Sequence, residues 1–186
     1  MVEDWRSLQL DIQREDAHTI QDALSHISHP QPVHVMSPTK PGVTIEASQQ
    51  VLIEALPPIL VLHMKRFLYD TDAKGVVKIG KMVQFTPELE IGKDIISPVR
   101  KGPHPVRYQL YGVLYHHGLS ASGGHYTLDV LHPNRDSSTK PREAWIRIDD
   151  ELVSDIRPED VFDGLDRDDR CAYLLFYRQI GAGTRT

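Results

Sequence analysis

The chain has 186 residues, of which 40% are hydrophobic and 25% are charged, and its formal net charge is −5. This composition is that of a globular protein the size of one domain, or a large piece of one, rather than of a disordered or fibrous chain. The acidic balance and the scattered basic residues argue against nucleic acid or an anionic membrane as a partner. The single cysteine, Cys171, excludes a disulfide framework and a cysteine-based zinc site within the chain.

Neither the N-terminus nor the apolar runs indicate a targeting or membrane segment. The opening MVEDWRSLQLDI mixes acidic and apolar residues and lacks the apolar stretch of a signal peptide. The longest apolar run, LPPILVLHM, is far shorter than the ~20 residues that a membrane-spanning helix needs. We therefore expect a soluble intracellular protein with a cytoplasmic location, and a nuclear location as a second one.

The first part of the chain predicts a strand and a short helix before a proline-rich stretch. Residues 5–12 alternate apolar and polar side chains, as a half-buried strand does. Over 16–27 the apolar residues recur at helical spacing, with Thr19 or Asp16 as the N-cap. Residues 29–44 contain four prolines and no clear period, which indicates a connector or an irregular extended strand.

The middle of the chain predicts a buried strand followed by a hairpin. ILVLHMKRFLYD (59–70) is apolar on both faces, as a central strand of a covered sheet is. Arg66 within this run is predicted to make either a structural ion pair or a contact with a partner, and the residues do not decide between them. Residues 71–85 predict a hairpin with Lys74-Gly75 as its turn, and a further strand follows over 86–98.

The last part of the chain predicts a series of strands rich in aromatic and branched residues. The predicted strands are 108–116, 125–132, 143–149 and 172–179, with a polar hairpin loop over 132–143, a helical turn at 157–162 and a disordered tail at 181–186. The whole chain is therefore predicted to be a mostly antiparallel β protein with one or two short helices, in the α+β class.

His125, at the start of one of these strands, is the first candidate for catalysis. The preceding Gly123-Gly124 permits positive φ and lets another backbone pass close by. Asp149 follows 24 residues later at the end of the next strand, where its carboxylate would accept a hydrogen bond from the Nδ1–H of His125. A plain glycine turn beside a half-buried histidine, with Asp149-Asp150 as turn residues, fits the same pattern, so the residues alone leave both interpretations open.

A catalytic base serves a nucleophile, and this chain offers only weak candidates for one. Ser120 and Ser122 lie in the loop before His125, but no GxSxG elbow surrounds them. Cys171 begins an apolar strand without a helix N-terminus to activate its thiol, so we expect it to pack as a small apolar side chain. The histidines between 116 and 125 match no common zinc spacing, so neither a metal nor another cofactor is expected.

Four segments together resemble a known family. LPPILVLHMKRF, YQLYGVLYHHGLSASGGHYTLDV, WIRIDDELV and AYLLFYRQ occur in this order and are similar to the C-terminal half of the ubiquitin-specific protease catalytic domain. The similarity runs from about Leu8 to Arg178. It implies a papain-like cysteine protease fold, of which residues 1–180 would form the palm-like β half. It also implies deubiquitination, the hydrolysis of the bond after the terminal glycine of ubiquitin, with ubiquitin and ubiquitinated proteins as partners and no cofactor.

The resemblance also assigns roles to residues of this chain. His125 corresponds to the general base and Asp149 to the third member of the catalytic triad, with Asp150 as a supporting acidic residue. Residues 118–124 correspond to a mobile loop over the C-terminal tail of ubiquitin. The residues that the resemblance places in contact with that tail are His117, Gly123, Gly124 and Tyr126.

Two features of the chain depart from the family's pattern. The family's catalytic cysteine precedes its histidine, whereas Cys171 follows His125 and cannot take that role by resemblance. The cysteine pairs that hold zinc in many members are also missing. The chain is therefore expected to supply the base and the acid without the nucleophile, as a late-starting sequence, a natural fragment or one half of a two-chain enzyme.

Two further expectations follow from the resemblance. The alternative to a protease part is a catalytically inactive module that binds ubiquitin or serves as a scaffold. The motif YHHGLSASGGHYT is similar to that of a subgroup whose best-known member binds a Ras-GAP SH3-domain-binding protein, which implies a partner of that type.

Overall fold

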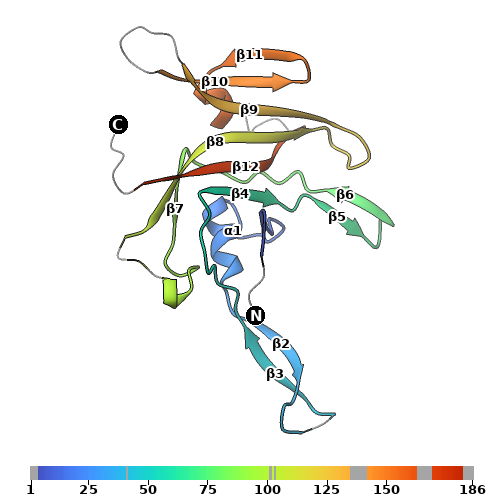
Figure 1. Ribbon diagram of the computed structural model, residues 1–186. Coiled ribbons are helices and arrows are strands. Elements are labelled where there is room, and N and C mark those ends of the chain that lie inside the picture. The colour runs from blue at the N-terminus through green and yellow to red at the C-terminus, as the bar shows by residue number, and fades with distance from the viewer. Residues whose placement is uncertain are drawn as a thin grey trace.

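The computed structural model describes residues 4–40, 42–100, 102, 104–134, 142–162 and 169–181, and its main element is an eight-stranded sheet. Its strand order is β1-β4-β12-β8-β9-β10-β11, with β7 also paired to β8 (Figure 1). The strands are β1 (Leu8–Leu10), β4 (Ile59–Met64), β7 (Glu88–Ile91), β8 (Val106–His117), β9 (His125–Asn134), β10 (Arg142–Asp149), β11 (Leu152–Ile156) and β12 (Arg170–Ile180). Among the paired strands of the described residues, only β1 and β4 run parallel, which confirms the mostly antiparallel prediction.

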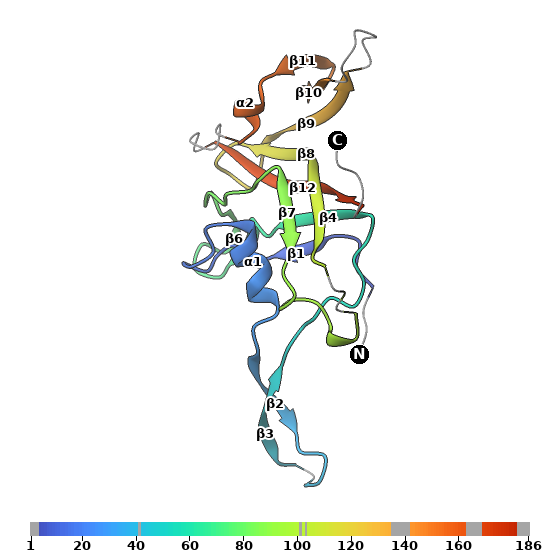
Figure 2. The ribbon, with the colours of Figure 1, turned by 90° about the vertical axis from the view of Figure 1, so that its left-hand side faces the viewer.

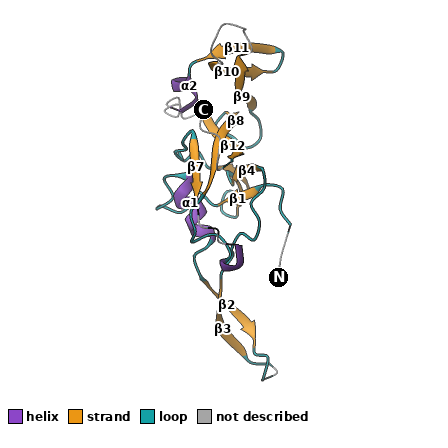
Figure 3. Cartoon of the chain, turned by 60° about the vertical axis from the view of Figure 1, so that its left-hand side comes forward, coloured by secondary structure: helices purple, strands orange, loops and turns teal. Residues whose placement is uncertain are grey.

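The helices are short and lie beside the sheet (Figure 3). They are α1 (Ile20–Ile27), α2 (Pro158–Phe162) and a 3-10 turn (Pro98–Arg100). Thr19, and not Asp16, caps α1: its side chain accepts from the Asp22 N–H at 3.1 Å, and the Asp22 carboxylate accepts from the Thr19 N–H at 2.8 Å. Among the described residues no helix is long and apolar enough to cross a membrane.

Two hairpins leave the main sheet. The proline-rich stretch forms β2 (Gln31–Met36), which pairs regularly with β3 (Thr44–Gln49), so the extended alternative is confirmed and the connector is not. This hairpin projects from one end of the molecule, opposite the end that carries β10 and β11 (Figure 2). The second hairpin joins β5 (Phe67–Asp70) to β6 (Gly75–Lys78), and Lys74, with φ of 49°, occupies the predicted turn.

The run 59–70 is two strands rather than the predicted single one, and Arg66 lies at the break between them. Its side chain is buried, with 1% of its surface exposed. The guanidinium donates to the backbone carbonyls of Ala172 (2.6 Å), Ile79 (2.9 Å) and Lys81 (2.7 Å). Both predictions for Arg66 are therefore wrong, because its donors meet carbonyls of this chain and, among the described residues, no carboxylate.

One apolar core connects the sheet with α1. Most of its fully buried members come from β1, β4, β7, β8 and β12, and from the inward face of α1, where Ile20, Ala23 and Leu24 are buried; α2 adds Val161. The predicted strands at 108–116, 125–132, 143–149 and 172–179 all belong to this sheet. Residues 135–141 of the predicted polar loop and 182–186 of the predicted tail lie outside the described residues.

The position of Arg66 gives a prediction about stability. Arg66→Met keeps the apolar stem but leaves three carbonyls without their donor, so we expect the free energy of unfolding to fall by about 3 kcal/mol. Arg178→Met is the matched control, since Arg178 is exposed, and it should change that free energy by less than about 0.5 kcal/mol. Urea unfolding followed by circular dichroism measures both, and equal effects would contradict this account of Arg66.

Candidate active site

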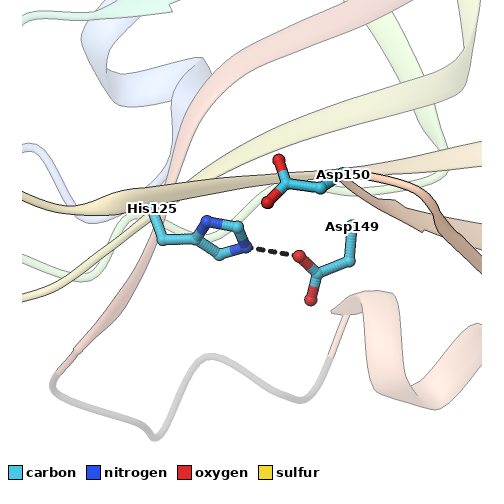
Figure 4. Close-up of side chains that lie close together, drawn as sticks. All are labelled: His125, Asp149 and Asp150. Atoms are coloured by element: carbon cyan, nitrogen blue, oxygen red, sulfur yellow. Dashed lines mark hydrogen bonds and ion pairs between the residues drawn. The ribbon is translucent and has the colours of Figure 1, made fainter.

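His125 and Asp149 lie together because two neighbouring antiparallel strands meet at their ends. His125 is the first residue of β9 and Asp149 is the last of β10, and the register pairs Ile148 with Leu128. His125 Nε2 and Asp149 Oδ1 are within hydrogen-bonding distance (Figure 4). The predicted contact between these two residues is therefore present.

The nitrogen that makes this contact is not the predicted one. We expected Asp149 to accept from Nδ1, but the structure pairs it with Nε2. The imidazole leaves β9 through Cγ, next to Nδ1, so Nε2 is the nitrogen that reaches across toward β10. Among the hydrogen bonds of the described residues none involves His125 Nδ1, which leaves this atom open to a group arriving from outside.

The pair remains accessible from solvent. The side chains of His125 and Asp149 keep 44% and 41% of their surface exposed. An ion pair this exposed contributes little to folding, typically below about 1 kcal/mol. The pair is therefore held in place by the strands beneath it rather than by its own attraction.

Asp150 brings a second carboxylate to the same place. It occupies the turn between β10 and β11 with φ of 52°, a left-handed conformation that aspartate tolerates better than most residues. One ligand atom each from His125, Asp149 and Asp150 lies within 4.8 Å of the other two (Figure 4). Such a trio has the donor types for a divalent cation, and without one it places two carboxylates beside a single imidazole.

The two glycines before His125 have different requirements. Gly124 has φ of 151°, and a Cβ there would lie 2.7 Å from both the His117 carbonyl oxygen and the His116 ring carbon Cε1. A Cβ on Gly123 would meet nothing within 4 Å. Only Gly124 is therefore required by packing, whereas Gly123 leaves open space above the backbone.

The other two predicted contact residues point to opposite faces of the sheet. His117 pairs with His125, and its ring lies 5.8 Å from that of His125 while Nε2 hydrogen-bonds Thr127 Oγ1 at 2.8 Å. Tyr126 faces the other way, is 46% exposed and packs its ring 5.0 Å from that of His116. The predicted set therefore surrounds the start of β9 instead of lining one face.

A buried charge cluster beneath the pair was not predicted. Asp129 is completely buried and accepts from Arg147 at 2.7 and 2.8 Å and from Arg170 at 2.7 Å. Arg170 lies 3.6 Å above the ring of Tyr115, and burial lowers the pKa of its guanidinium. The usable signal in the sequence was Asp129 on the face of His125, with Arg147 on the matching face of the next strand.

Cys171 cannot serve His125 in this structure. It pairs with His116, whereas His125 pairs with His117, and successive residues of β8 face opposite sides. Cys171 is also buried, with its Sγ 3.9 Å from the Gly80 carbonyl, as expected for a packed apolar side chain. Ser120 and Ser122 hydrogen-bond each other at 2.9 Å in the exposed loop, and no hydrogen bond joins either to His125 among the described residues.

One buried and two partly buried histidines predict that acid destabilises the fold. Burial lowers the pKa of His117 below its ordinary 6.5, with Arg170 and His125 adding to the effect, and burial does the same for His63 and His116. The unfolded chain therefore takes up protons first, so stability is complete above the ordinary value and falls as the pH drops below it. Carboxylates such as Asp22, whose pKa is lowered by the Thr19 hydrogen bonds, stay ionised in that range.

His117→Gln tests this expectation, because glutamine can still donate to Thr127 but takes up no proton. Melting temperatures at about pH 7.5 and about pH 5.5 should show a smaller loss for the variant than for the parent chain. An equal or larger loss in the variant would show that His117 does not contribute.

Comparison with known proteins identifies the family. A model of the ubiquitin carboxyl-terminal hydrolase family matches residues 7–177. The probable ubiquitin carboxyl-terminal hydrolase 3 of Schizosaccharomyces pombe is 40% identical over 188 residues, which cover 95% of this chain and 35% of that protein. Ubiquitin carboxyl-terminal hydrolase 10 of Rattus norvegicus is 40% identical over 177 residues, which cover 94% of this chain and 21% of that protein. The chain thus spans between a fifth and about a third of these relatives.

Solved structures agree on the fold. A chain of a SAGA DUB module superposes with a TM-score of 0.73 at 25% identity, covering 95% of this chain and 36% of that one. A chain of the SAGA Ubp8/Sgf11/Sus1/Sgf73 DUB module bound to ubiquitin aldehyde gives 0.72 at 24% identity, covering 94% and 36%. The predicted α+β, papain-like fold is confirmed, and the chain belongs to the ubiquitin carboxyl-terminal hydrolase family.

Proposed function

We propose that this chain is the part of a deubiquitinating cysteine protease that supplies the general base and the carboxylate that orients it. The contact between His125 Nε2 and Asp149 Oδ1, made at the adjoining ends of β9 and β10, carries this proposal. An acid–imidazole couple of this kind is what a cysteine nucleophile needs beside it. The family and the names of its relatives support ubiquitin as the substrate.

The chemistry follows from the two ring nitrogens. Asp149 accepts from Nε2–H, which leaves Nδ1 unprotonated to take the proton of an incoming thiol. The thiolate then attacks the carbonyl carbon of ubiquitin's last residue, and the protonated imidazole returns a proton to the departing amine. A water that gives its proton to Nδ1 hydrolyses the thioester, releasing the carboxylate of ubiquitin and the free thiol.

The thiol in this scheme comes from outside these 186 residues. Cys171 is the sole cysteine and lies on the opposite face of the sheet from His125. Because the His125–Asp149 pair is half exposed, a segment that carries a cysteine can approach it without displacing any described element. Asp150, in the adjoining turn, would add to the negative charge that stabilises the imidazolium.

The start of β9 suits a glycine-rich tail of a substrate. His125 and Tyr126 lie on opposite faces, so a tail that contacts both has to cross the backbone at Gly123-Gly124. Gly123 offers open space for that crossing, since a side chain there would meet nothing within 4 Å. We place the tail over these glycines, with Tyr126 on one side and His117, beside His125, on the other.

A chimaera tests the proposed roles. This chain replaces the matching region of Schizosaccharomyces pombe ubiquitin carboxyl-terminal hydrolase 3, and kcat/KM is measured on ubiquitin with a fluorogenic amide. The chimaera should be active, His125→Ala should lower kcat/KM by at least about 10³-fold, and Asp149→Asn by at least about tenfold. His132→Ala, exposed on the same strand, is the matched control and should keep activity within about twofold. An active chimaera that tolerates His125→Ala would disprove the assignment.

The isolated chain should not react through Cys171. A ubiquitin probe with an electrophilic C-terminus should leave the purified chain unlabelled, because the thiol is buried and faces away from His125. Mass spectrometry of the intact chain measures this, and a probe adduct on Cys171 would contradict it. An NMR titration with ubiquitin, made on the isolated chain and on its His125→Ala variant, tests the alternative function. Equal binding by both, together with an inactive chimaera, would favour the scaffolding module.

Two finer proposals rest on the sequence alone. The motif YHHGLSASGGHYT supports a partner of the Ras-GAP SH3-domain-binding type, and a pull-down with a purified protein of that type tests this proposal. A cytoplasmic location, with a nuclear one as the second, is supported by the single, unpaired cysteine, which suits a reducing compartment, and imaging of a tagged chain tests it.

A further inference from the structure

The loop that joins β8 to β9, residues 118–124, begins and ends at two glycines that lie close together directly before His125. We call this close approach of Gly118 and Gly124 the neck of the loop. Gly118 and Gly124 have φ values of 102° and 151°, and a Cβ on Gly118 would lie 3.6 Å from the Gly124 Cα. The Gly118 N–H donates to the Asp169 carbonyl at 2.8 Å, next to the start of β12. Because His125 is the residue after Gly124, the geometry of this neck sets where the imidazole begins.

Lys78, the last residue of β6, holds one side of the neck. Its Nζ donates to the Gly118 carbonyl and lies 3.4 Å from the His116 carbonyl. A hydrogen bond from a charged donor is stronger than one between neutral groups. No ion pair of the described residues involves Lys78, so the neck carbonyls are the partners that the structure provides for this ammonium.

The His116 side chain holds the other side of the neck. It is 3% exposed and lies beneath Gly124, where its ring would clash with any Cβ. The rings of Phe67 and Tyr126 pack edge-on against it at 5.2 and 5.0 Å, so the imidazole has little freedom to move.

Neither side chain can reach the reacting atoms. His116 pairs with Tyr126 and His117 with His125, so His116 lies on the face of the sheet opposite His125. Lys78 contacts the neck through carbonyls of β8 and the loop, not through His125 itself. Any effect of the two residues on catalysis therefore passes through the position of the loop.

We propose that Lys78 and His116 are positioning residues that close the 118–124 neck and thereby fix His125 in line with Asp149. Lys78 ties the exit from β8, and His116 supports the entry into β9. Release of either one lets Gly124 move and separates the imidazole from the carboxylate for part of the time. The consequence for catalysis rests on the proposed function, whereas the structural link between neck and imidazole does not.

NMR of the isotope-labelled 186-residue chain tests this link without ubiquitin or a nucleophile. Lys78→Met removes the donor and keeps the stem. The Gly118 amide, which donates to the Asp169 carbonyl, should then exchange at least about tenfold faster, and the ring ¹⁵N shifts of His125 should move toward those of an imidazole that exchanges between tautomers. Lys78→Arg, which keeps a charged donor, should restore much of the parent signature.

Lys81→Met is the matched control, because Lys81 also donates to backbone carbonyls, those of Arg14 and Glu15, but not to the neck. It should leave the His125 shifts and the exchange of the Gly118 amide as in the parent chain. His116→Gln is the second test and decides the matter if Lys78→Met does not fold. Parent-like His125 shifts and glycine exchange in the folded variants would overturn the proposal.

Measurements on the chimaera and on the isolated chain together distinguish the positioning role from the proposed function. In the chimaera, Lys78→Met should lower kcat more than it raises KM, since the base is misplaced while the binding surface stays. A loosened His125 in the isolated chain together with an inactive parent chimaera would remove the proposed function and leave the positioning role. Unchanged NMR spectra with an active chimaera would remove the positioning role alone.

Discussion

The candidate site depends on the ion pairs that the buried carboxylate of Asp129 makes with two arginines. It accepts from Arg147 of β10 and Arg170 of β12, so one side chain of β9 ties together strands on both of its sides. Leaving the buried guanidinium of Arg170 without this partner would create an uncompensated buried charge, at a cost of roughly 3–5 kcal/mol. The strands that carry His125 and Asp149 are thereby held in one register.

The charge cluster around Asp129 explains how the His125–Asp149 pair keeps its geometry although its own attraction is weak. His125 and Asp149 are each more than two-fifths exposed, where attraction between charges is screened and side chains remain mobile. Asp129 lies four residues from His125 along β9, and Arg147 lies two residues from Asp149 along β10, on the same faces. The buried contacts in the middle of β9 and β10 fix the positions of the exposed strand ends, and the exposed site thereby has a defined geometry.

Sequence patterns predicted what depends on periodicity and missed what depends on side-chain direction. The alternation over 125–132 and 143–149 predicted both strands and the meeting of His125 with Asp149. It could not predict that Nε2 makes the contact, because the choice of nitrogen depends on the distance between β10 and the backbone of His125. Arg66 was misjudged because a charged residue in an apolar run usually signals a charged partner, whereas here three carbonyls at a strand break satisfy it. β11 was missed because its side chains are nearly all exposed and show no apolar alternation.

The alternation of strand faces also explains how half of a site can exist without its nucleophile. The face of His117 and His125 carries the proposed base, its proposed acid and the buried charge cluster, while the face of His116 carries Cys171 and the rings of Phe67 and Tyr126. Asp149 occupies Nε2 and the cluster fixes the strands, so both operate within this chain alone. Under the proposed function, a thiol from another segment would have to approach only Nδ1 of an imidazole that is already oriented. The entropy of arranging base and acid is lost when the sheet folds rather than when the active site assembles.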